Sequence, residues 1–428
     1  TLAERYNTRK SIDHKQIGMT WEQRFGANRL QVTAYGGNRR VVQYQSFSRG
    51  FQAPPTHSGG VVDFDRDFRG LDVNWRDVRE LAGGTLRTTL GIDMGRSTDS
   101  RQGFENFVGN EFGVRGKLRR DEEDEVGNTD PYLQAEWERG DWVVTGGLRH
   151  SRVTFDVADR YLSNGNDSGH VNYSHTTPLV GLLYKLTPTL NLYASAARGF
   201  ETPTLNEVFY SGAGAGFNFN LQPATSTHLE AGVKAFVGSN TRVNAALFQV
   251  KTRDELVVDV SSGGRTSYRN ASATLRQGGE LSVDADLGAG WNAKLALTLL
   301  RAIYDEGFGT VRAGSRLPAV PKTSVYGEFG WKEAAGRYGA AFEAIGNGRV
   351  YAEDTNTAQA APGYAIFNAR AQAGQEWGGW KIKEFVRLNN LFDTQYVGSV
   401  IVGDANRRFY EGAPGRNWVA GVSAQYQF

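Results

Sequence analysis

Apolar and polar residues alternate with a period of two in segments spread along the whole chain. The last of these segments, residues 418–428, reads WVAGVSAQYQF, and Trp418, Val422 and Phe428 share one side of it with other apolar residues. Successive side chains of a strand point to opposite sides, so the pattern predicts a β-strand. One apolar face ending in aromatic residues and one small or polar face suit a strand between lipid and water.

The same alternation recurs in many other segments of the chain. Six clear examples are 16–22, 29–35, 86–94, 132–137, 291–299 and 324–331. A soluble β-sandwich also alternates, but it seldom repeats Trp and Tyr at the strand ends, and its connections are not sorted by length. The repeated pattern therefore favours a membrane barrel over a sandwich.

The expected connections between these strands fall into two length classes that alternate along the chain. The short ones are 25–28, 138–141, 186–189, 237–240, 287–290 and 376–379; the long ones are 47–60, 104–128, 160–169, 199–226, 305–320, 354–362 and 399–416. Short periplasmic turns and long extracellular loops are typical of outer-membrane barrels. We therefore predict an all-β fold, a transmembrane antiparallel β-barrel, with about 17 strands in this chain.

The composition agrees with a β-barrel and argues against a helical membrane protein and against a nucleic-acid-binding protein. The mean hydropathy is −0.47, and no run approaches the roughly 18 apolar residues that a membrane helix needs. The net charge of +2 indicates no nucleic-acid partner. The sequence has no signal peptide, so we expect either that one was removed or that this chain is not the complete product.

Strand direction suggests that the chain is part of a larger barrel. The expected strand near 14–25 leads into a short turn, so it runs downward, as does the last strand, 418–428. Bacterial single-chain barrels have even strand numbers, and their neighbouring strands run in opposite directions. We therefore expect residues 1 to about 13 to lie in an outer loop, and an odd number of earlier strands to be missing.

Four segments together resemble TonB-dependent outer-membrane receptors. They are NLYASAARGFETPTLNEV (191–208), LPAVPKTSV (317–325), RLNNLFDTQYV (387–397) and GAPGRNWVAGVSAQYQF (412–428). They follow the family's order over the C-terminal 240 residues, and the terminal aromatic residue resembles the signal that outer-membrane assembly machinery recognises. Residues 31–45 and 58–76 resemble a subgroup related to receptors for pyrroloquinoline quinone, and neighbouring subgroups are ferric-siderophore receptors.

The resemblance implies a 22-stranded barrel around an N-terminal plug, in the bacterial outer membrane. Residues 1–428 would then be the C-terminal part, strands 6 to 22, with the plug, the TonB box and the first strands missing. Implied partners are the TonB complex through the missing plug, outer-membrane lipid and lipopolysaccharide, and a small-molecule ligand such as a ferric siderophore or an anionic cofactor. The family is mostly monomeric and needs no bound cofactor of its own.

Uptake of a scarce anionic ligand needs high affinity. Arg contributes bidentate hydrogen bonds to carboxylates, and aromatic rings stack on flat ligand surfaces. Our candidates lie where strands meet long loops. They are Tyr44, Arg49, Phe51, Arg198, Phe200, Asn206, Tyr210, Arg301, Tyr304, Arg407, Arg408 and Tyr410. Such aromatic residues also form interface girdles, and loop Arg also contacts lipopolysaccharide. For Arg198, a role in barrel folding or plug packing is favoured.

We predict no enzyme activity, no catalytic residue and no metal site. The sequence has no cysteine and no Gly-x-Ser-x-Gly, and its six His lack metal-ligand spacing. The charged run 117–125, KLRRDEEDE, lacks calcium-loop spacing, and we expect a solvated surface loop there.

Two other functions stay open. A passive diffusion porin would normally have 16 or 18 strands and an inward constricting loop. A structural or adhesive barrel would have no transport role.

Overall fold

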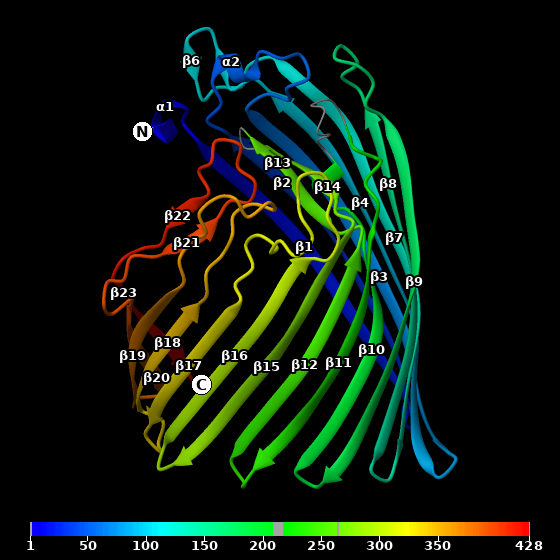
Figure 1. The fold of residues 1–428 in the computed structure, drawn as a ribbon, viewed down its shortest axis with the longest axis vertical. Helices are drawn as coiled ribbons and strands as arrows, with labels where there is room; N and C mark the ends of the chain where they lie inside the picture. The colour runs from blue at the N-terminus through cyan, green and yellow to red at the C-terminus, as the bar shows by residue number, and fades with distance from the viewer. Residues whose placement is uncertain (1, 209–216, 263–264, 428) are drawn as a thin grey trace. The chain divides into compact units, whose positions relative to one another are not determined.

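The computed structural model describes residues 2–208, 217–262 and 265–427. Its 17 long strands are joined in one antiparallel sheet (Figure 1), which confirms the predicted all-β fold and strand count. The chain divides into two compact units. Unit 1 holds residues 1–180, 197–225 and 256–270, and unit 2 holds residues 181–196, 226–255 and 271–428. In the described ranges, no helix is long and apolar enough to cross a membrane.

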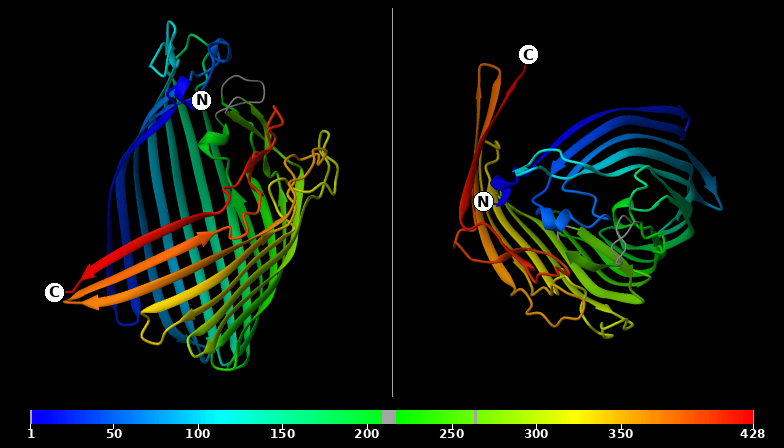
Figure 2. Two further views of the ribbon diagram at one scale, coloured as in Figure 1. Left: turned by 90° about the vertical axis from the view of Figure 1, so that its left-hand side faces the viewer. Right: turned by 90° about the horizontal axis from the view of Figure 1, so that it is seen from above.

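Unit 1 is built on long antiparallel strands that follow one another in chain order (Figures 1 and 2, blue to cyan). Each pairs with the next through a turn or loop. They are β1 (Arg9–Phe25), β2 (Asn28–Tyr44), β3 (Val61–Leu81), β4 (Gly84–Phe104), β7 (Leu118–Arg139), β8 (Trp142–Asp159) and most of β9 (Gly169–Thr187).

The loops of unit 1 carry short elements of their own. These are α1 (Leu2–Arg5), α2 (Arg49–Gln52), β5 (Phe107–Val108), β6 (Glu111–Phe112), α3 (Leu205–Val208) and the hairpin of β13 (Leu256–Ser262) and β14 (Arg265–Asn270). The strand β10 (Leu190–Glu201) is divided between the two units.

Unit 2 has shorter strands, again paired in chain order. They are β11 (Ala224–Val237), β12 (Thr241–Arg253), β15 (Ala273–Gly288), β16 (Trp291–Tyr304), β17 (Thr323–Lys332), β18 (Tyr338–Asn347), β19 (Tyr364–Trp377), β20 (Trp380–Asn389) and β23 (Asn417–Tyr426), with a small hairpin of β21 (Val397–Val400) and β22 (Tyr410–Gly412).

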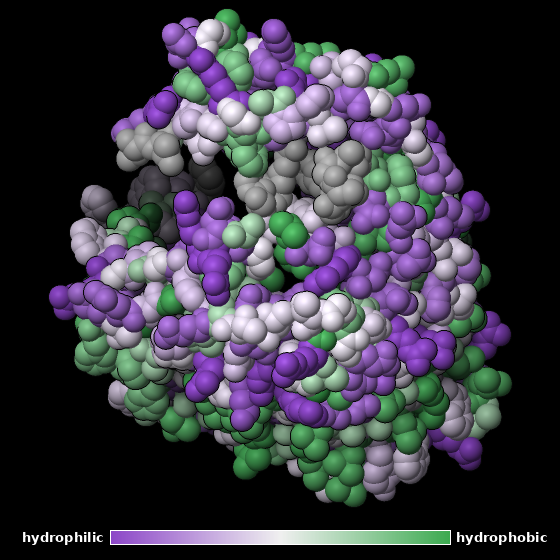
Figure 3. Space-filling view, turned by 45° about the horizontal axis from the view of Figure 1, so that its top comes forward, coloured by the Kyte–Doolittle hydropathy of each residue, from purple (hydrophilic) through white to green (hydrophobic). Residues whose placement is uncertain are grey.

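The strand register gives each unit one apolar face, as the alternation predicts. In unit 1, Trp21 lies opposite Val32, and Val32 lies opposite Val73. In unit 2, Leu281 lies opposite Leu297, which faces Val325 on the next strand. Other apolar side chains of the long strands are exposed to a degree unusual for apolar residues, reaching 80% for Ile17 of β1 and 73% for Leu247 of β12. On the face that Figure 3 presents, green apolar side chains gather toward the lower edge and purple polar ones nearer the loops.

Two expected boundaries were wrong. Residues 118–128 belong to β7 and pair with β4, so the predicted loop 104–128 is shorter, and the run 117–125 is not a solvated loop. Alternate charges of that run meet partners on β4; Arg96 bonds to Glu125, for example. The first strand begins at Arg9, so residues 9–13 are not loop. The larger barrel inferred from the directions of the first and last strands stays a prediction.

Unit 1 has an apolar core where loops cover the polar face of its wall. Phe155 and Val157 of β8 and Tyr173 of β9 pack with loop residues that are equally buried, namely Leu205, Val208 and Leu221. Partly buried residues of the β13–β14 hairpin, Leu256 and Tyr268, join them. Burial of this apolar surface holds the loop after β10 against the wall.

Candidate ligand-binding site

In unit 2, the long loops at one end of the strands brace one another. The Tyr304 hydroxyl donates to Asp354 Oδ1 at 2.6 Å, and Asn356 Oδ1 accepts from the backbone N–H of Arg316 at 2.6 Å. The backbone N–H of Gly403 donates to the carbonyl of Ala352 at 3.0 Å. These bonds tie loops 305–322, 348–363 and 390–409 into one assembly.

One side chain organises the middle loop of this assembly. A single oxygen of Glu353, Oε1, accepts from the backbone N–H groups of Thr357 and Ala358 at 2.8 and 2.6 Å and from the Thr355 hydroxyl at 3.0 Å. Burial acts to raise the pKa of Glu353, but the hydrogen bonds from Thr357, Ala358 and Thr355 outweigh it and hold the pKa below its ordinary value. The carboxylate therefore stays charged and keeps its loop folded at neutral pH.

The loop 401–409 presents two free arginines. Phe409 is buried and anchors the loop, and the backbone N–H of Arg408 donates to Asp404 Oδ2 at 2.7 Å. The side chains of Arg407 and Arg408 are exposed and make no ion pair within the described residues. Two neighbouring guanidinium groups on an anchored loop can grip a carboxylate or another planar anion.

The other candidates of unit 2 have structural partners. Tyr304 is fully buried beneath the loops, and Tyr410 donates its hydroxyl to the carbonyl of Gln359. Arg301 lies on the apolar face, in register with Gln277, and donates to Gln277 Oε1 at 3.3 Å. Only Arg407 and Arg408 of these five are unpaired in the described structure.

The first loop region of unit 1 uses its candidates for internal packing. The Arg9 guanidinium lies 3.5 Å from the centre of the Tyr44 ring. Arg49 lies over the rings of Phe107 and Phe112, at 5.1 and 5.2 Å, and donates to Asn110 at 3.0 Å. Phe51 packs edge-on against His57.

The motif after β10 is a capped helical turn. The backbone N–H of Thr204 donates to Glu207 Oε2 at 2.7 Å, as in a capping box, and Leu205 and Val208 are buried in the core of unit 1. Phe200 packs on the same core. Arg198 and Asn206 are exposed, and Tyr210 lies outside the described residues. The twelve candidates are therefore not brought together in one place.

Sequence reasoning missed a ladder of charges on the polar face of unit 2. Glu328 and Glu343 lie directly opposite each other on β17 and β18. Arg387 bonds to Glu343 with both Nη atoms, one of them at 2.6 Å, and Arg370 bonds to Glu328 at 2.9 Å. The two carboxylates are buried, so each needs its arginine. Charges at alternate positions on the polar side of these strands were the available signal.

A cavity of about 710 Å³ lies over this ladder. Glu328, Arg370 and Arg387 line it together with Lys383 and Phe385. Because the arginines are already paired, Lys383 is the cation on β20 that is left for a ligand or a polypeptide. The volume is in the range of small-molecule sites.

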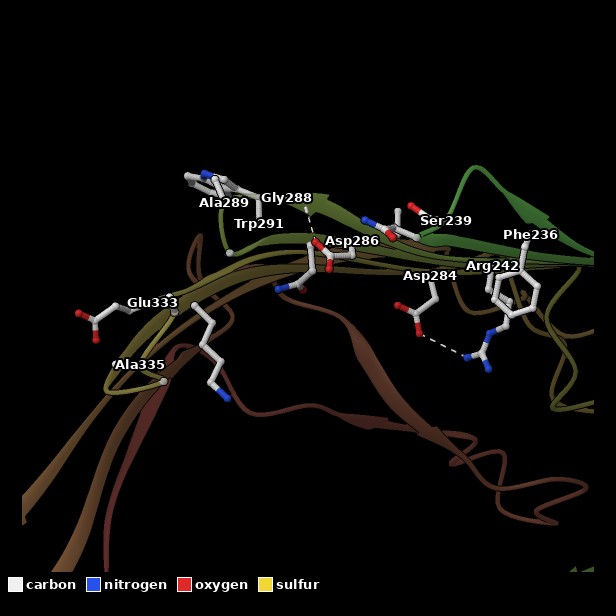
Figure 4. Close-up of a pocket in the computed structure, with 17 residues that line it drawn as sticks. Phe236, Ser239, Arg242, Asp284, Asp286, Gly288, Ala289, Trp291, Glu333 and Ala335 are labelled. Atoms are coloured by element: carbon white, nitrogen blue, oxygen red, sulfur yellow. Dashed lines mark hydrogen bonds and ion pairs between the residues drawn. The ribbon is translucent and has the colours of Figure 1, made fainter. Parts of the chain in front are cut away.

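A second space, of about 810 Å³, surrounds the short turns of unit 2 (Figure 4). On one side of the strands, Arg242 and Asp284 form an ion pair at 3.3 Å. Trp291 points to the opposite side of the strands. A space that wraps around both sides of a sheet rim encloses no ligand, so we assign no site there.

Unit 1 holds an unusual pair of buried acids on its polar face. Asp99 of β4 lies opposite Asp124 of β7, and Arg66 bonds to both oxygens of Asp99 at 2.6 Å. Asp124 is 1% exposed, and neither of its oxygens has a hydrogen-bond partner in the part of the chain that the structure describes. Burial without a partner favours the neutral acid. No group of three or more acidic or histidine side chains in the described parts could hold a metal ion.

Residues 2–391 match the family "TonB dependent receptor-like, beta-barrel", and the chain belongs to this family of transport receptors. It is 28% identical over 294 residues to the metal-pseudopaline receptor CntO of Pseudomonas aeruginosa, a match over 65% of this chain and 37% of CntO. It is 25% identical over 190 residues to the vitamin B12 transporter BtuB of Photobacterium profundum, a match over 44% of this chain and 25% of BtuB. The matched part of the chain thus spans between a quarter and two fifths of the length of these relatives.

Solved structures share the fold. The ferric citrate transporter FecA, in its unliganded form, superposes with a TM-score of 0.80 at 15% identity, over 98% of this chain and 62% of FecA. The siderophore receptor PiuA of Acinetobacter baumannii gives 0.77 at 16% identity, over 98% and 65%. The fold is therefore that of the TonB-dependent receptor barrels, as predicted.

Proposed function

We propose that this chain is the barrel wall of a bacterial outer-membrane receptor that binds a scarce anionic ligand and imports it with energy relayed by TonB. Family membership supports uptake rather than passive diffusion or adhesion. The apolar faces of both units suit contact with lipid, and the polar faces suit a water-filled or protein-filled interior. The receptor would act as a monomer, with no catalytic group of its own.

The main support for an anionic ligand is the pair of neighbouring arginines, Arg407 and Arg408. Both guanidinium groups are exposed, have no ion pair among the described residues and are held on a loop that Phe409 anchors. A receptor named for metal-pseudopaline is among the relatives, and structures named for ferric citrate and siderophores are among the neighbours. Metal chelates with free carboxylates, or an anionic cofactor such as pyrroloquinoline quinone, fit such a loop.

The test is binding to the intact chain, folded in detergent micelles and followed by intrinsic tryptophan fluorescence. The probes are ferric citrate, zinc–pseudopaline, pyrroloquinoline quinone and cobalamin. We expect one of the three anions to bind, and Arg407→Gln with Arg408→Gln to weaken that binding at least about tenfold, as expected for two charge-assisted hydrogen bonds.

A matched control replaces two exposed arginines elsewhere in unit 2, Arg253→Gln with Arg312→Gln, and should bind normally. The proposal fails if none of the three anions binds, or if both double variants bind alike.

A further inference from the structure

The polar face of unit 2 is hollow near the short turns, because its strands carry glycine and alanine there in place of larger side chains. Gly330 of β17 lies opposite Ala341 of β18, and Gly339, two positions from Ala341, lies opposite Gln372 of β19. Because alternate residues share a face, these residues lie on the same side as Glu328, and they line the cavity of about 710 Å³ over the charge ladder. The hollow is therefore built into the wall of the sheet.

Two amide side chains form the floor of this hollow. A Cβ added at Gly330 would lie 2.9 Å from Asn292 Oδ1, and one added at Gly339 would lie 3.3 Å from Gln372 Nε2, so the amides lie across the two glycines. Neither amide group has a hydrogen-bond partner among the described residues. Because each amide carries two N–H donors, the floor can donate hydrogen bonds to a bound anion.

Two lysines without ion-pair partners stand on either side of the floor. Lys332 of β17 lies opposite Gly339, and Lys383 of β20 lies opposite Gly374 of β19. Both lysine side chains are exposed, line the cavity and make no ion pair within the described ranges. Their strands are three positions apart in the sheet, which places the two backbones roughly 14 Å apart. Their long side chains can therefore reach one small molecule between them.

The other charges that line the cavity are paired or lie on the opposite face. Arg370 and Arg387 pair with the buried carboxylates of the ladder, and Arg337 pairs with the carboxylate of the short turn beside it at 2.9 Å. Glu384 lies opposite Val422 in the register, so its side chain belongs to the apolar face. The two lysines therefore give the hollow an excess of positive charge, which favours an anion.

An exposed aromatic ring gives the hollow a second kind of contact. Phe385 alternates with Lys383 and Arg387 on β20, so it lies on the polar face, and it is 48% exposed. A Cβ added at Gly421 of β23 would lie 2.5 Å from the Phe385 ring, so the ring lies over this glycine and its exposed part faces away from the sheet. A ring held in this way can stack on a flat ligand.

We propose that this hollow is a second anion site, which binds a small planar polycarboxylate. The two lysines hold its carboxylates from either side, the two amides donate hydrogen bonds from the floor, and the ring of Phe385 stacks on its plane. The hollow lies at the short-turn end of the strands, whereas Arg407 and Arg408 lie in a loop beyond the opposite end of β20. The role of the site rests on the proposed uptake function: an anion released by the loops would occupy the hollow before it leaves the barrel.

The test measures binding of trimesate, a benzene ring with three carboxylates, to the full chain in detergent micelles by equilibrium dialysis. Lys332→Gln with Lys383→Gln should lower the affinity at least about tenfold, because it removes both unpaired charges. Arg253→Gln with Arg312→Gln, which removes the same charge elsewhere in unit 2, should leave the affinity unchanged. Phe385→Leu should weaken binding of trimesate several-fold but leave that of tricarballylate, a flexible tricarboxylate without a ring, unchanged.

Each of four results would overturn the inference: no binding of trimesate at millimolar concentration, equal affinity in the two double variants, equal binding of the uncharged triamide of trimesate, or equal effects of Phe385→Leu on the two acids. Circular dichroism confirms that each variant folds. Arg407→Gln with Arg408→Gln should bind trimesate like the wild type, so failure of the hollow and failure of the loop site give different results. A loss of trimesate binding in that loop variant equal to the loss in the lysine variant would also contradict a separate site.

Discussion

The two units use their strands differently. In unit 1, β3, β4 and β7 have 21, 21 and 22 residues, whereas in unit 2, β17, β18 and β20 have 10 each. About ten residues are enough to cross a bilayer, so roughly half of each long strand in unit 1 continues beyond the apolar band. In unit 2, β17, β18 and β20 have only the length needed to cross, and loops begin where they end.

This difference in strand length affects which charged side chains have ion-pair partners. The extended strands of unit 1 bring acids and bases into register, and pairs such as Arg66 with Asp99 neutralise one another. The loops of unit 2 are held by a few polar anchors such as Tyr304, which leaves Arg407 and Arg408 unpaired. A continuous sheet therefore gives a rigid wall, and braced loops give a surface that can bind.

The largest expected effect breaks the apolar core of unit 1. Phe155→Ala should lower the free energy of unfolding by about 3–5 kcal/mol, because it leaves a cavity under the loop after β10. Chemical denaturation measures the loss, and limited proteolysis should show earlier cleavage within 202–208 and 217–223. Leu162→Ala, at an exposed loop position, is the control and should cost less than about 0.5 kcal/mol. Equal losses in the two variants would contradict a stabilising role for this core in unit 1.

The second effect tests the charge ladder of unit 2. Arg387→Gln should cost about 2–3 kcal/mol, because it leaves the buried Glu343 with only a long hydrogen bond from Asn368 and the more distant Arg370. Adding Glu343→Gln should restore part of the loss. Lys383→Gln, four residues earlier on the same face, should be nearly neutral. If it costs as much as Arg387→Gln, the ladder does not stabilise unit 2.

A smaller loss is expected where the loops of unit 2 meet their strands. Tyr304→Phe should cost about 1–2 kcal/mol, since it removes the hydrogen bond from the hydroxyl to the buried Asp354. Hydrogen exchange should accelerate in loop 348–363. Tyr410→Phe removes a hydrogen bond at an exposed site and should have the weaker effect. The opposite ranking would contradict the bracing role of Tyr304.

The smallest effect is a pH dependence of that same loop. The folded-state pKa of Glu353 lies below its ordinary value of 4.5, so its contribution to stability is present above that value and is lost as the pH falls through the lowered pKa. Pepsin cleavage within 348–363 should therefore rise a few-fold more in the wild type than in Glu353→Gln as the pH is lowered from 5 to 3. Parallel responses of the two proteins would contradict this role.

Strand pattern and fold were predictable because alternation records which side of a strand meets lipid. Trp418 and Val422, at alternate positions of β23, are 71% and 72% exposed, as the terminal pattern indicated. The run 117–125 was misassigned because its charges suggest solvent. In the fold, alternate members such as Glu122 and Asp124 are buried on the polar face. That burial depends on the pairing with β4, which places Arg101 opposite Glu122 and Asp99 opposite Asp124, and local sequence does not reveal this pairing.

The candidate site was only partly predictable. Arg407 and Arg408 stand where loop chemistry suggests a ligand, and they are exposed. Tyr304 was chosen for the same reason and lies buried, because its partner Asp354 is 50 residues away in another loop. The β13–β14 hairpin and its contribution to the core of unit 1 were not foreseen, since local alternation does not show where a loop will pack.

The most direct test asks which unit a bound anion protects. Hydrogen exchange of the intact chain should be compared with and without the tightest-binding anion among ferric citrate, zinc–pseudopaline and pyrroloquinoline quinone. The account predicts slower exchange in residues 397–412 of unit 2 and no change in residues 45–60 of unit 1. Protection confined to residues 45–60, with none in 397–412, would contradict it.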